Sequence, residues 1–304
     1  MFEKILIATD FSNHAEKIID CVGEIPAVKE VVLLHVIAKD PLARTWSPGD
    51  DLKRATEQME APAKQLKESG LSVKVRAEIA EETPEHVVIS RVAREEDVSL
   101  VVMGARGRSI WEGLVLGSVS SGYLRYGDRD LLIMRYKKDM GRFCSLIFEK
   151  VLAPTDFSLA GNAAIERIKQ TGLAKNLVLL NVVARGEDAS RVEEAISAAK
   201  SRLDEMASDL KGSGIDAKTV AVSTLGQGAR TYGSGGMVKV EATPLATVGG
   251  VVDKILTVAE MENASLIALG SHGKGWIDEA TIGSVAQDAA RMGPRPVLIV
   301  RSRK

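Results

Sequence analysis

The sequence predicts an α/β protein built from two tandem doubly wound domains, each a five-stranded parallel sheet with helices on both faces. The first observation behind this prediction is that several segments of the chain occur twice. The second is that short apolar runs alternate with segments of helical periodicity, which is typical of parallel strands buried on both faces. The third is the length of 304 residues, which suits two domains of roughly 100–200 residues each.

The repeat is visible in three segments of the first copy that recur in the second: residues 4–12 as 150–158, 31–36 as 177–182, and 100–104 as 266–270. The spacing between the last two segments is longer in the second copy, which indicates an insertion there. We therefore predict one domain over residues 1–140 and a second over residues 141–304, with the insertion near residues 225–247.

Short apolar runs place the strands of the first copy at residues 4–8, 31–36, 73–79, 100–103 and 131–134. The first helix is predicted from apolar residues at helical spacing, namely Ala15, Ile18, Ile19 and Val22. Thr83 and Pro84 predict the start of a later helix, with Thr83 as the N-cap and Pro84 at the first helical position. A short helix is predicted after Ser118.

A longer helix is predicted between about Asp51 and Ser69, where one face carries Leu52, Ala55, Met59, Ala63 and Leu66. Pro62 should kink or split it, and Gly70 should end it. Its counterpart in the second copy has a clearer apolar stripe, formed by Val192, Ala195, Ile196, Ala199, Leu203, Met206 and Leu210. Gly212 and Gly214 follow this stripe as helix breakers.

The overall composition excludes several classes of protein. Hydrophobic residues make up 45% and charged residues 27%, which is unlike a disordered chain. Lys and Arg total 40 against 41 Asp and Glu, so no global positive field is available to hold nucleic acid or an anionic membrane. The N-terminus lacks the features of a signal peptide, and apolar runs such as residues 100–103 are too short to span a bilayer. We expect a cytoplasmic protein with neither a nucleic acid nor a membrane as partner.

The two cysteines, Cys21 and Cys144, are far apart and form no CxxC or Cys/His cluster. We expect them to be buried hydrophobic residues or free thiols rather than ligands of zinc or redox groups.

Glycines after the fourth strand form the most specific pattern in the chain. Gly104 and Gly107 are followed, after nine residues, by Gly117 and Ser118, and the second copy repeats this spacing with Gly270, Gly273, Gly283 and Ser284. Glycines let a backbone approach an anion closely, and the amides at the start of a helix favour negative charge. A tight strand-to-helix turn is the alternative explanation. The identical spacing in both copies favours a phosphate site.

This glycine pattern, together with an Asp just after the first strand, resembles the universal stress protein family over nearly the whole chain. The resemblance implies an adenine nucleotide alpha hydrolase-like fold. The ATP-binding branch of that family keeps the glycine motif, so the resemblance also implies ATP or a related nucleotide, ADP or AMP, with Mg²⁺ as a further expectation.

The resemblance implies site residues at matching positions of both copies. In the first copy these are Ala8, Thr9, Asp10, Val36, Met103 and Gly104 around adenine and ribose, and Gly107, Gly117, Ser118 and Val119 around the phosphates. In the second copy they are Pro154, Thr155, Asp156, Val182, Leu269, Gly270, Gly273, Gly283, Ser284 and Val285.

Several of these interpretations have alternatives. Asp10 and Asp156 could instead cap the helix that follows them. The charged residues in and between the glycine loops could neutralise phosphates, recruit Mg²⁺ or form a solvated face; they are Arg106, Arg108, Glu112, His272, Lys274, Asp278 and Glu279. Trp111 and Trp276 are out of register between the copies, so we interpret them as packing residues. His35 is replaced by Asn181 in the second copy, which favours a structural hydrogen bond over shared catalysis.

The insertion is rich in glycine at its start, so residues 226–236 should be flexible, while residues 237–242 alternate like a strand. It should emerge at the ligand edge of the sheet, either as a flap beside the second site or as a disordered loop. The family resemblance implies that the two fifth strands, residues 131–134 and 297–300, pair with each other, and an apolar edge strand also needs covering. Residues 143–148 should lead into the second domain, as an extension of its first strand.

Three functions compete on these observations. The first is a nucleotide-dependent binding or regulatory module of the stress response. The second is a slow ATPase or nucleotidyl transferase, although no catalytic residue can be named and no Walker A motif occurs. The third is a dimerisation protein with vestigial sites. A homodimer is compatible with each of them.

Overall fold

The structure of the protein is a computed structural model, and it describes residues 2–22, 25, 27–39, 46–105, 116–135, 147–183, 189–224, 230–233, 236–239, 250–273 and 282–301. The elements of the first domain are β1 (Lys4–Ala8), α1 (Asn13–Val22), β2 (Glu30–Ala38), α2 (Pro48–Glu68), β3 (Ser72–Ala80), α3 (Glu85–Glu95), β4 (Leu100–Gly104), α4 (Ser118–Tyr126) and β5 (Asp130–Met134). Those of the second are β6 (Val151–Pro154), α5 (Leu159–Thr171), β7 (Asn176–Val183), α6 (Ala189–Gly212), β8 (Asp216–Ser223), β9 (Arg230–Gly233), β10 (Gly236–Lys239), α7 (Val251–Met261), β11 (Leu266–Gly270), α8 (Ser284–Met292) and β12 (Val297–Val300).

The described strands form one sheet of 12 strands, in the order β10-β9-β8-β7-β6-β11-β12-β5-β4-β1-β2-β3. Within the first domain β1 pairs in parallel with both β2 and β4, and within the second β6 pairs in parallel with both β7 and β11. The strand order therefore reverses at β1 and at β6. This arrangement confirms the predicted pair of doubly wound domains.

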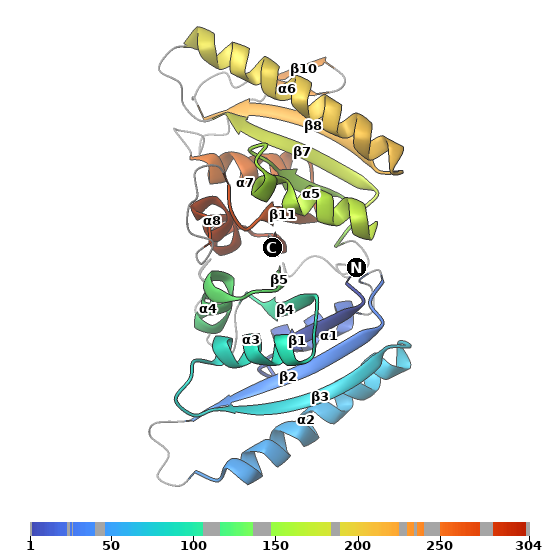
Figure 1. The fold of residues 1–304 in the computed structure, drawn as a ribbon, viewed down its shortest axis with the longest axis vertical. Helices are drawn as coiled ribbons and strands as arrows, with labels where there is room; N and C mark the ends of the chain where they lie inside the picture. The colour runs from blue at the N-terminus through green and yellow to red at the C-terminus, as the bar shows by residue number, and fades with distance from the viewer. Residues whose placement is uncertain are drawn as a thin grey trace.

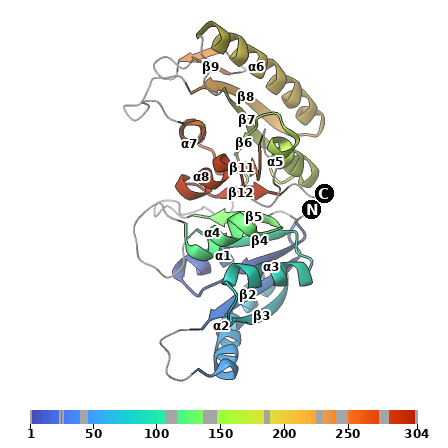
Figure 2. The same cartoon turned by 60° about the vertical axis from the view of Figure 1, so that its left-hand side comes forward.

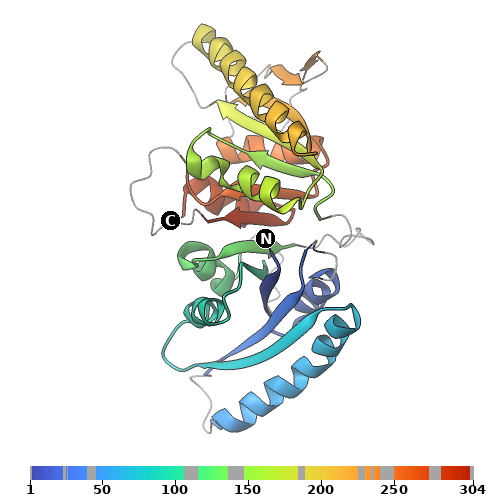
Figure 3. The same ribbon diagram turned by 45° about the vertical axis from the view of Figure 1, so that its right-hand side comes forward.

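Helices cover both faces of the sheet (Figures 1 and 3). One buried cluster packs α1, α2, α5 and α6 on one face, and a second packs α3, α4, α7 and α8 on the other. Ile5 and Ile7 belong to the first cluster, whereas Leu6 between them belongs to the second. Because successive residues of a strand point to opposite faces and both faces are buried, the strands are unbroken apolar runs in the sequence.

The helix boundaries depart from the predictions at two prolines. Pro62 does not split α2, which runs on to Glu68, because its apolar face, including Met59 and Leu66, is buried on the sheet. Gly70 follows the end of this helix with a φ of +86°, as its role as a terminator requires. The prediction for Pro84 was wrong by one residue: Pro84 is extended, with a ψ of 144°, and is itself the N-cap of α3.

The lead-in to the second domain is a turn over residues 147–149, so the predicted strand extension is wrong for these residues. Ile147 and Phe148 are buried there, which explains their apolar character without a strand. Residues 143–146 and the predicted boundary near residue 140 lie outside the described residues.

The insertion of the second domain contains a β-hairpin. Strand β9 pairs antiparallel with β10, and it also pairs antiparallel with the edge of β8. The predicted strand over residues 237–242 overlaps β10, but the glycine-rich part expected to be flexible contains β9. The hairpin thus extends the parallel sheet of the second domain.

The two domains join through their last strands. Strand β12 pairs antiparallel with β5, with Val297, Leu298 and Ile299 opposite Ile133, Leu132 and Leu131. Figure 2 shows β5 and β12 side by side at the middle of the molecule. This register confirms the predicted pairing and carries both hydrophobic clusters across the domain junction.

A buried ionic contact reinforces the junction. The Asp130 side chain is fully buried, and its Oδ2 lies 2.5 Å from Nη1 of Arg167 in the other domain. Its Oδ1 accepts a hydrogen bond of 2.9 Å from the backbone N–H of Arg301. A buried carboxylate needs such partners, because desolvation of a lone charge is costly.

Cys21 is buried in α1 as expected, but it is disulfide-bonded, so the expectation of a free thiol is wrong for this residue. Cys144, the other cysteine of the sequence, lies outside the described residues. Of the helices in the described part of the chain, none has the length and apolarity needed to cross a membrane.

The Asp130 contact gives a test of the junction. Asp130→Ala should destabilise the protein by about 3–5 kcal/mol in equilibrium denaturation, because it leaves a largely buried Arg167 without its carboxylate. Asp128→Ala is the matched control, since Asp128 forms an exposed pair with Arg94 and its loss should cost less than about 1 kcal/mol. Equal stability of the two variants would contradict this account of the junction.

Candidate functional site

Two cavities lie at equivalent places in the two domains. The first, of about 320 Å³, opens at the carboxyl ends of β1 and β4, and the second, of about 230 Å³, at the carboxyl ends of β6 and β11. These are the points where the strand order reverses and where doubly wound sheets leave room for a ligand.

The structure brings the predicted site residues together around these cavities. The first is lined by Ala8, Thr9, Asp10, Val36, Met103, Gly104, Gly117, Ser118 and Val119. The second is lined by Pro154, Thr155, Asp156, Val182, Leu269, Gly270, Gly273, Gly283, Ser284 and Val285. The remaining candidate, Gly107, lies outside the described residues.

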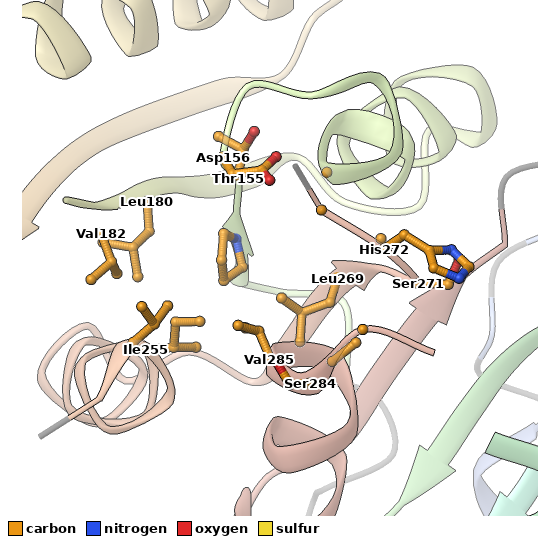
Figure 4. Close-up of a pocket in the computed structure, with 17 residues that line it drawn as sticks. Thr155, Asp156, Leu180, Val182, Ile255, Leu269, Ser271, His272, Ser284 and Val285 are labelled. Atoms are coloured by element: carbon orange, nitrogen blue, oxygen red, sulfur yellow. The ribbon is translucent and has the colours of Figure 1, made fainter. Parts of the chain in front are cut away.

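Figure 4 shows the layout of the second cavity. Leu180, Val182 and Ile255 lie together at one end, while Ser284 and Val285 project from α8. The cavity therefore has an apolar wall and also reaches the start of a helix.

The turn after the first strand is held by the predicted aspartates. Asp10 Oδ1 accepts hydrogen bonds from the N–H and the hydroxyl of Ser12, at 3.1 and 2.6 Å. Asp156 holds Ser158 in the same way, at 2.9 and 2.6 Å. Ser158 is the residue that caps α5, because its Oγ accepts a bond of 2.9 Å from the N–H of Gly161. Asp156 thus supports the cap without being the cap residue and also lines the cavity, and its contact with a nucleotide stays a prediction.

The same turn carries local backbone strain in both domains. Phe11 and Phe157 have φ angles of 59° and 66°, in the left-handed region that costs a non-glycine residue about 1–3 kcal/mol. Their N–H groups donate to Oγ1 of Thr9 and Thr155, at 3.2 and 2.8 Å. The threonines thereby fix a turn that aims the neighbouring aspartate.

His35 has a structural role, as its replacement by Asn181 predicted. Its Nδ1 lies 2.8 Å from the carbonyl oxygen of Thr9, which can only accept, so Nδ1 carries the proton. In the second domain Nδ2 of Asn181 donates to the carbonyl oxygen of Thr155 at the same distance of 2.8 Å. Two different side chains therefore make one hydrogen bond to the strained turn.

The far side of each cavity is the start of a helix. Gly117 and Gly283 are the N-caps of α4 and α8, and their N–H groups donate to the carbonyl oxygens of Ala105 and Ser271 at 2.8 Å. Ser118 and Ser284 follow as exposed first helical residues. The first amides of a helix have no partner within it, so these ends can accept an anion.

One glycine of the motif is required by close packing. A Cβ built on Gly270 would lie 1.8 Å from the carbonyl oxygen of Ala160, at the start of α5. A larger residue would therefore push α5, and with it Asp156, away from the cavity. This steric demand explains the glycine at the end of β11 independently of any ligand.

Several lining residues escaped the sequence reasoning. In the first cavity they are Ala15, Glu85, Ile89 and Ser120, and in the second Gly161, Leu180, Val251, Ile255, Ser271 and Ala286. Most occupy equivalent positions of the two copies. Two pairs, Glu85 with Ile89 and Val251 with Ile255, are spaced by four residues on helices that begin beside the cavity. This spacing places both members of each pair on one helix face, which the sequence could have indicated.

The roles expected for the charged and aromatic residues in and between the glycine loops stay predictions. His272 lines the second cavity, and its Nδ1 lies 2.9 Å from Oγ of Ser271. Its companions in the glycine loops and spacers lie outside the described residues, namely Arg106, Arg108, Trp111, Glu112, Lys274, Trp276, Asp278 and Glu279. Within the described ranges, no group of three or more His, Cys, Asp or Glu side chains is placed to hold a metal ion.

The fold and the paired cavities define a protein with two tandem domains of the adenine nucleotide alpha hydrolase-like fold. The chain belongs to the universal stress protein family, whose sequence pattern it matches over residues 1–135 and 148–301. The two matched stretches correspond to the two copies of the repeat.

Known universal stress proteins resemble the chain over one domain or over both. Universal stress protein Rv2623 of Mycobacterium tuberculosis is 23% identical over 310 residues, covering 98% of this chain and 96% of that protein. Universal stress protein MJ0577 of Methanocaldococcus jannaschii is 25% identical over 163 residues, which are 52% of this chain and 97% of that protein. The crystal structure of a universal stress protein from Archaeoglobus fulgidus superposes with a TM-score of 0.69 at 23% identity, covering 98% of this chain and 96% of that one. The superposition on the Archaeoglobus fulgidus structure supports the assignment of the fold.

The hydrogen bond shared by His35 and Asn181 gives a matched pair of variants. His35→Asn should change the free energy of unfolding by less than about 1 kcal/mol, because the amide can make the same bond. His35→Leu should destabilise by about 1–3 kcal/mol, because it leaves the carbonyl oxygen of Thr9 without this donor. Equilibrium denaturation measures both. A leucine variant no less stable than the asparagine variant would refute the structural role.

Proposed function

We propose that the chain binds an adenine nucleotide in each cavity and acts as a nucleotide-dependent regulatory module. The observation that carries this proposal is the combination, present twice, of an apolar wall with a glycine-capped helix start. A nucleotide has the matching halves, since its base is flat and largely apolar and its phosphates are anionic.

The apolar wall suits the base. Val36, Ile89 and Met103 line the first cavity, and Val182, Ile255 and Leu269 line the second at matching positions. Ligand cavities typically combine such aliphatic walls with a few placed polar groups. Asp10 and Asp156, held by their serines, are the polar groups placed to meet the ribose.

The helix start suits the phosphates. The amides after Gly117 and Gly283, together with the positive end of the helix dipole, favour an anion, and the hydroxyls of Ser118 and Ser284 are exposed beside them. The glycine spacing also resembles that of the ATP-binding branch of the family. We therefore propose ATP, or its relatives ADP and AMP, with Mg²⁺ accompanying the phosphates.

Binding accounts for the described residues better than catalysis does. Among the described lining residues, Glu85 is present only in the first cavity and His272 only in the second. In the acidic pair common to both, Asp10 and Asp156, Oδ1 holds a serine, and we assign the rest of each carboxylate to the ribose rather than to proton transfer. Hydrolysis or nucleotidyl transfer by both domains would require a shared proton acceptor, and these positions do not supply one.

Two experiments test the proposal together: identification of the nucleotides that the purified protein carries, and ATP titration of variants with a negative charge added at each helix start. Protein denatured directly after purification should release up to two adenine nucleotides per chain, identified by mass spectrometry, and titration with Mg²⁺–ATP should give two sites. Ser118→Asp and Ser284→Asp should each weaken one site at least about fivefold, because like charges about 4 Å apart repel by about 1–4 kcal/mol.

These aspartates suit a helix N-terminus, so the variants should stay folded. Ser47→Asp is the control, since it places the same charge at the N-terminal end of α2, outside the lining of either cavity. No binding of ATP, ADP or AMP by the unmodified chain would refute the proposal. Unchanged binding in both single variants would refute the assignment of the helix starts.

The two cavities should differ in affinity, because Glu85 lines the first where Val251 lines the second. A carboxylate near bound phosphates repels them, by about 1 kcal/mol at a separation of roughly 10 Å. We expect Glu85→Val to strengthen ATP binding in the first domain about fivefold, and Val251→Glu to weaken it in the second by a similar factor.

Calorimetric titration in the Ser284→Asp and Ser118→Asp backgrounds would report each site separately. Glu82→Val is the control, because Glu82 is exposed and is not among the residues that line the cavity. Unchanged or opposite shifts in the reciprocal pair would show that Glu85 does not set the difference between the sites.

A further inference from the structure

The side chain that follows the last strand of each domain reaches into the other domain. Arg135 follows β5, and its Nη2 donates to the carbonyl oxygens of Ala290 and Arg291 at 2.7 and 2.8 Å. Arg301 follows β12, and its Nη2 donates to the carbonyl oxygens of Tyr123, at 3.3 Å, and Leu124. Each arginine thus holds the last turn of the other domain's final helix, α8 or α4.

Both arginine side chains are buried, and the carbonyl groups they contact are suitable partners for a buried cation. Arg135 and Arg301 are only 8% and 9% exposed. Burial lowers the pKa of the Arg301 guanidinium, and the helix carbonyls supply the acceptors that a buried cation needs. The last carbonyl groups of a helix lack partners within it, and a cation there also complements the helix dipole.

The two helices held by the arginines, α4 and α8, lie beside the seam between the domains (Figures 1 and 2). Both figures show α4 and α8 facing each other across this seam. A cavity of about 270 Å³ separates them, lined by Leu116, Ser121, Leu124, Arg125, Ile282, Gln287 and Arg291. The arginines provide polar contacts between one domain and the final helix of the other.

Each arginine is also tied through its backbone neighbour to the glycine loop of its own domain. The N–H of Ser271 donates to the carbonyl oxygen of Val300, at 2.9 Å, and Arg301 follows directly. The N–H of Ala105 likewise donates to the carbonyl oxygen of Met134, at 3.0 Å, before Arg135. One short chain of contacts therefore links the loop of one cavity to the helix that lines the other.

We propose that Arg135 and Arg301 are positioning residues for nucleotide binding, each aligning the phosphate-binding helix of the opposite domain and thereby coupling the two sites. This inference rests on the proposed function, because it assigns the helix starts at Gly117 and Gly283 to phosphates. The guanidinium holds one end of a nine-residue helix and the phosphates meet the other end. A displacement of the helix axis at one end moves the amides at the other.

The prediction is a crossed loss of affinity. Arg301→Met should weaken Mg²⁺–ATP binding in the first domain about fivefold or more, which is the lower end of typical coupling between two sites. The affinity of the second domain should stay within about twofold of that of the unmodified chain. Arg135→Met should do the reverse. The own-domain site is spared because the backbone hydrogen bonds of Val300 and Met134 do not depend on the replaced side chains.

Calorimetric titration of the full chain in the Ser284→Asp background reads the first site, and the Ser118→Asp background reads the second. The two arginine variants are matched controls for each other, since both remove a similar contact from the same junction. A purely structural role would lower the melting temperature and weaken both sites together in both variants. Arg301→Lys and Arg135→Lys keep one donor and the charge, so they should restore part of the affinity, and they carry the test if the methionine variants do not fold.

A loss confined to the arginine's own domain, an equal loss in both sites, or no loss would overturn the inference while leaving nucleotide binding intact. Absence of ATP binding by the unmodified chain would overturn the proposed function first and this inference with it. The two failures are therefore distinguishable in one set of titrations.

Discussion

The antiparallel pairing of β5 with β12 is the contact on which the rest of the molecule depends. It covers two apolar edge strands that would otherwise present unpaired backbone groups, and it joins two parallel sheets into one. Because the two strands lie side by side at the seam, residues at and just beyond their ends lie beside the neighbouring domain. The buried contact of Asp130 with Arg167 and the reach of Arg135 and Arg301 across the seam are consequences of that position.

The sheet topology determines where the candidate sites lie, and the side chains near the strand ends determine their chemistry. A sheet whose order reverses at its first strand opens at the carboxyl ends of β1 and β4, and only residues near those ends can line the opening. The strained turns at Phe11 and Phe157 then fix an aspartate at one side, and glycine-capped helices form the other. The recurrence of this arrangement with different side chains, such as His35 and Asn181, shows that the backbone geometry is what the two copies share.

The repeat, the glycine spacing and the family resemblance they carry predicted the fold, the seam and most of the residues around both cavities, because parallel strands bring their ends to one edge. The spacing of four residues places Glu85 with Ile89, and Val251 with Ile255, on one helix face, but that this face is turned toward the cavity depends on how the helix is rotated on the sheet. Nothing in the sequence indicated that Arg135 and Arg301 cross the seam, because this requires the relative placement of two domains. Pro62 misled the reasoning because burial of Met59 and Leu66 outweighs the loss of one helix hydrogen bond.

The covalent fusion of the two copies also has an evolutionary consequence. In a symmetric pair of identical chains, every substitution appears on both sides of the seam, so a change useful in one cavity is imposed on the other. Here the two halves are encoded separately, and they have diverged: Glu85 faces one cavity and Val251 the other, and among the described residues the β9–β10 hairpin belongs to the second half alone. Fusion thus lets each half of a single polypeptide change its cavity without changing the other.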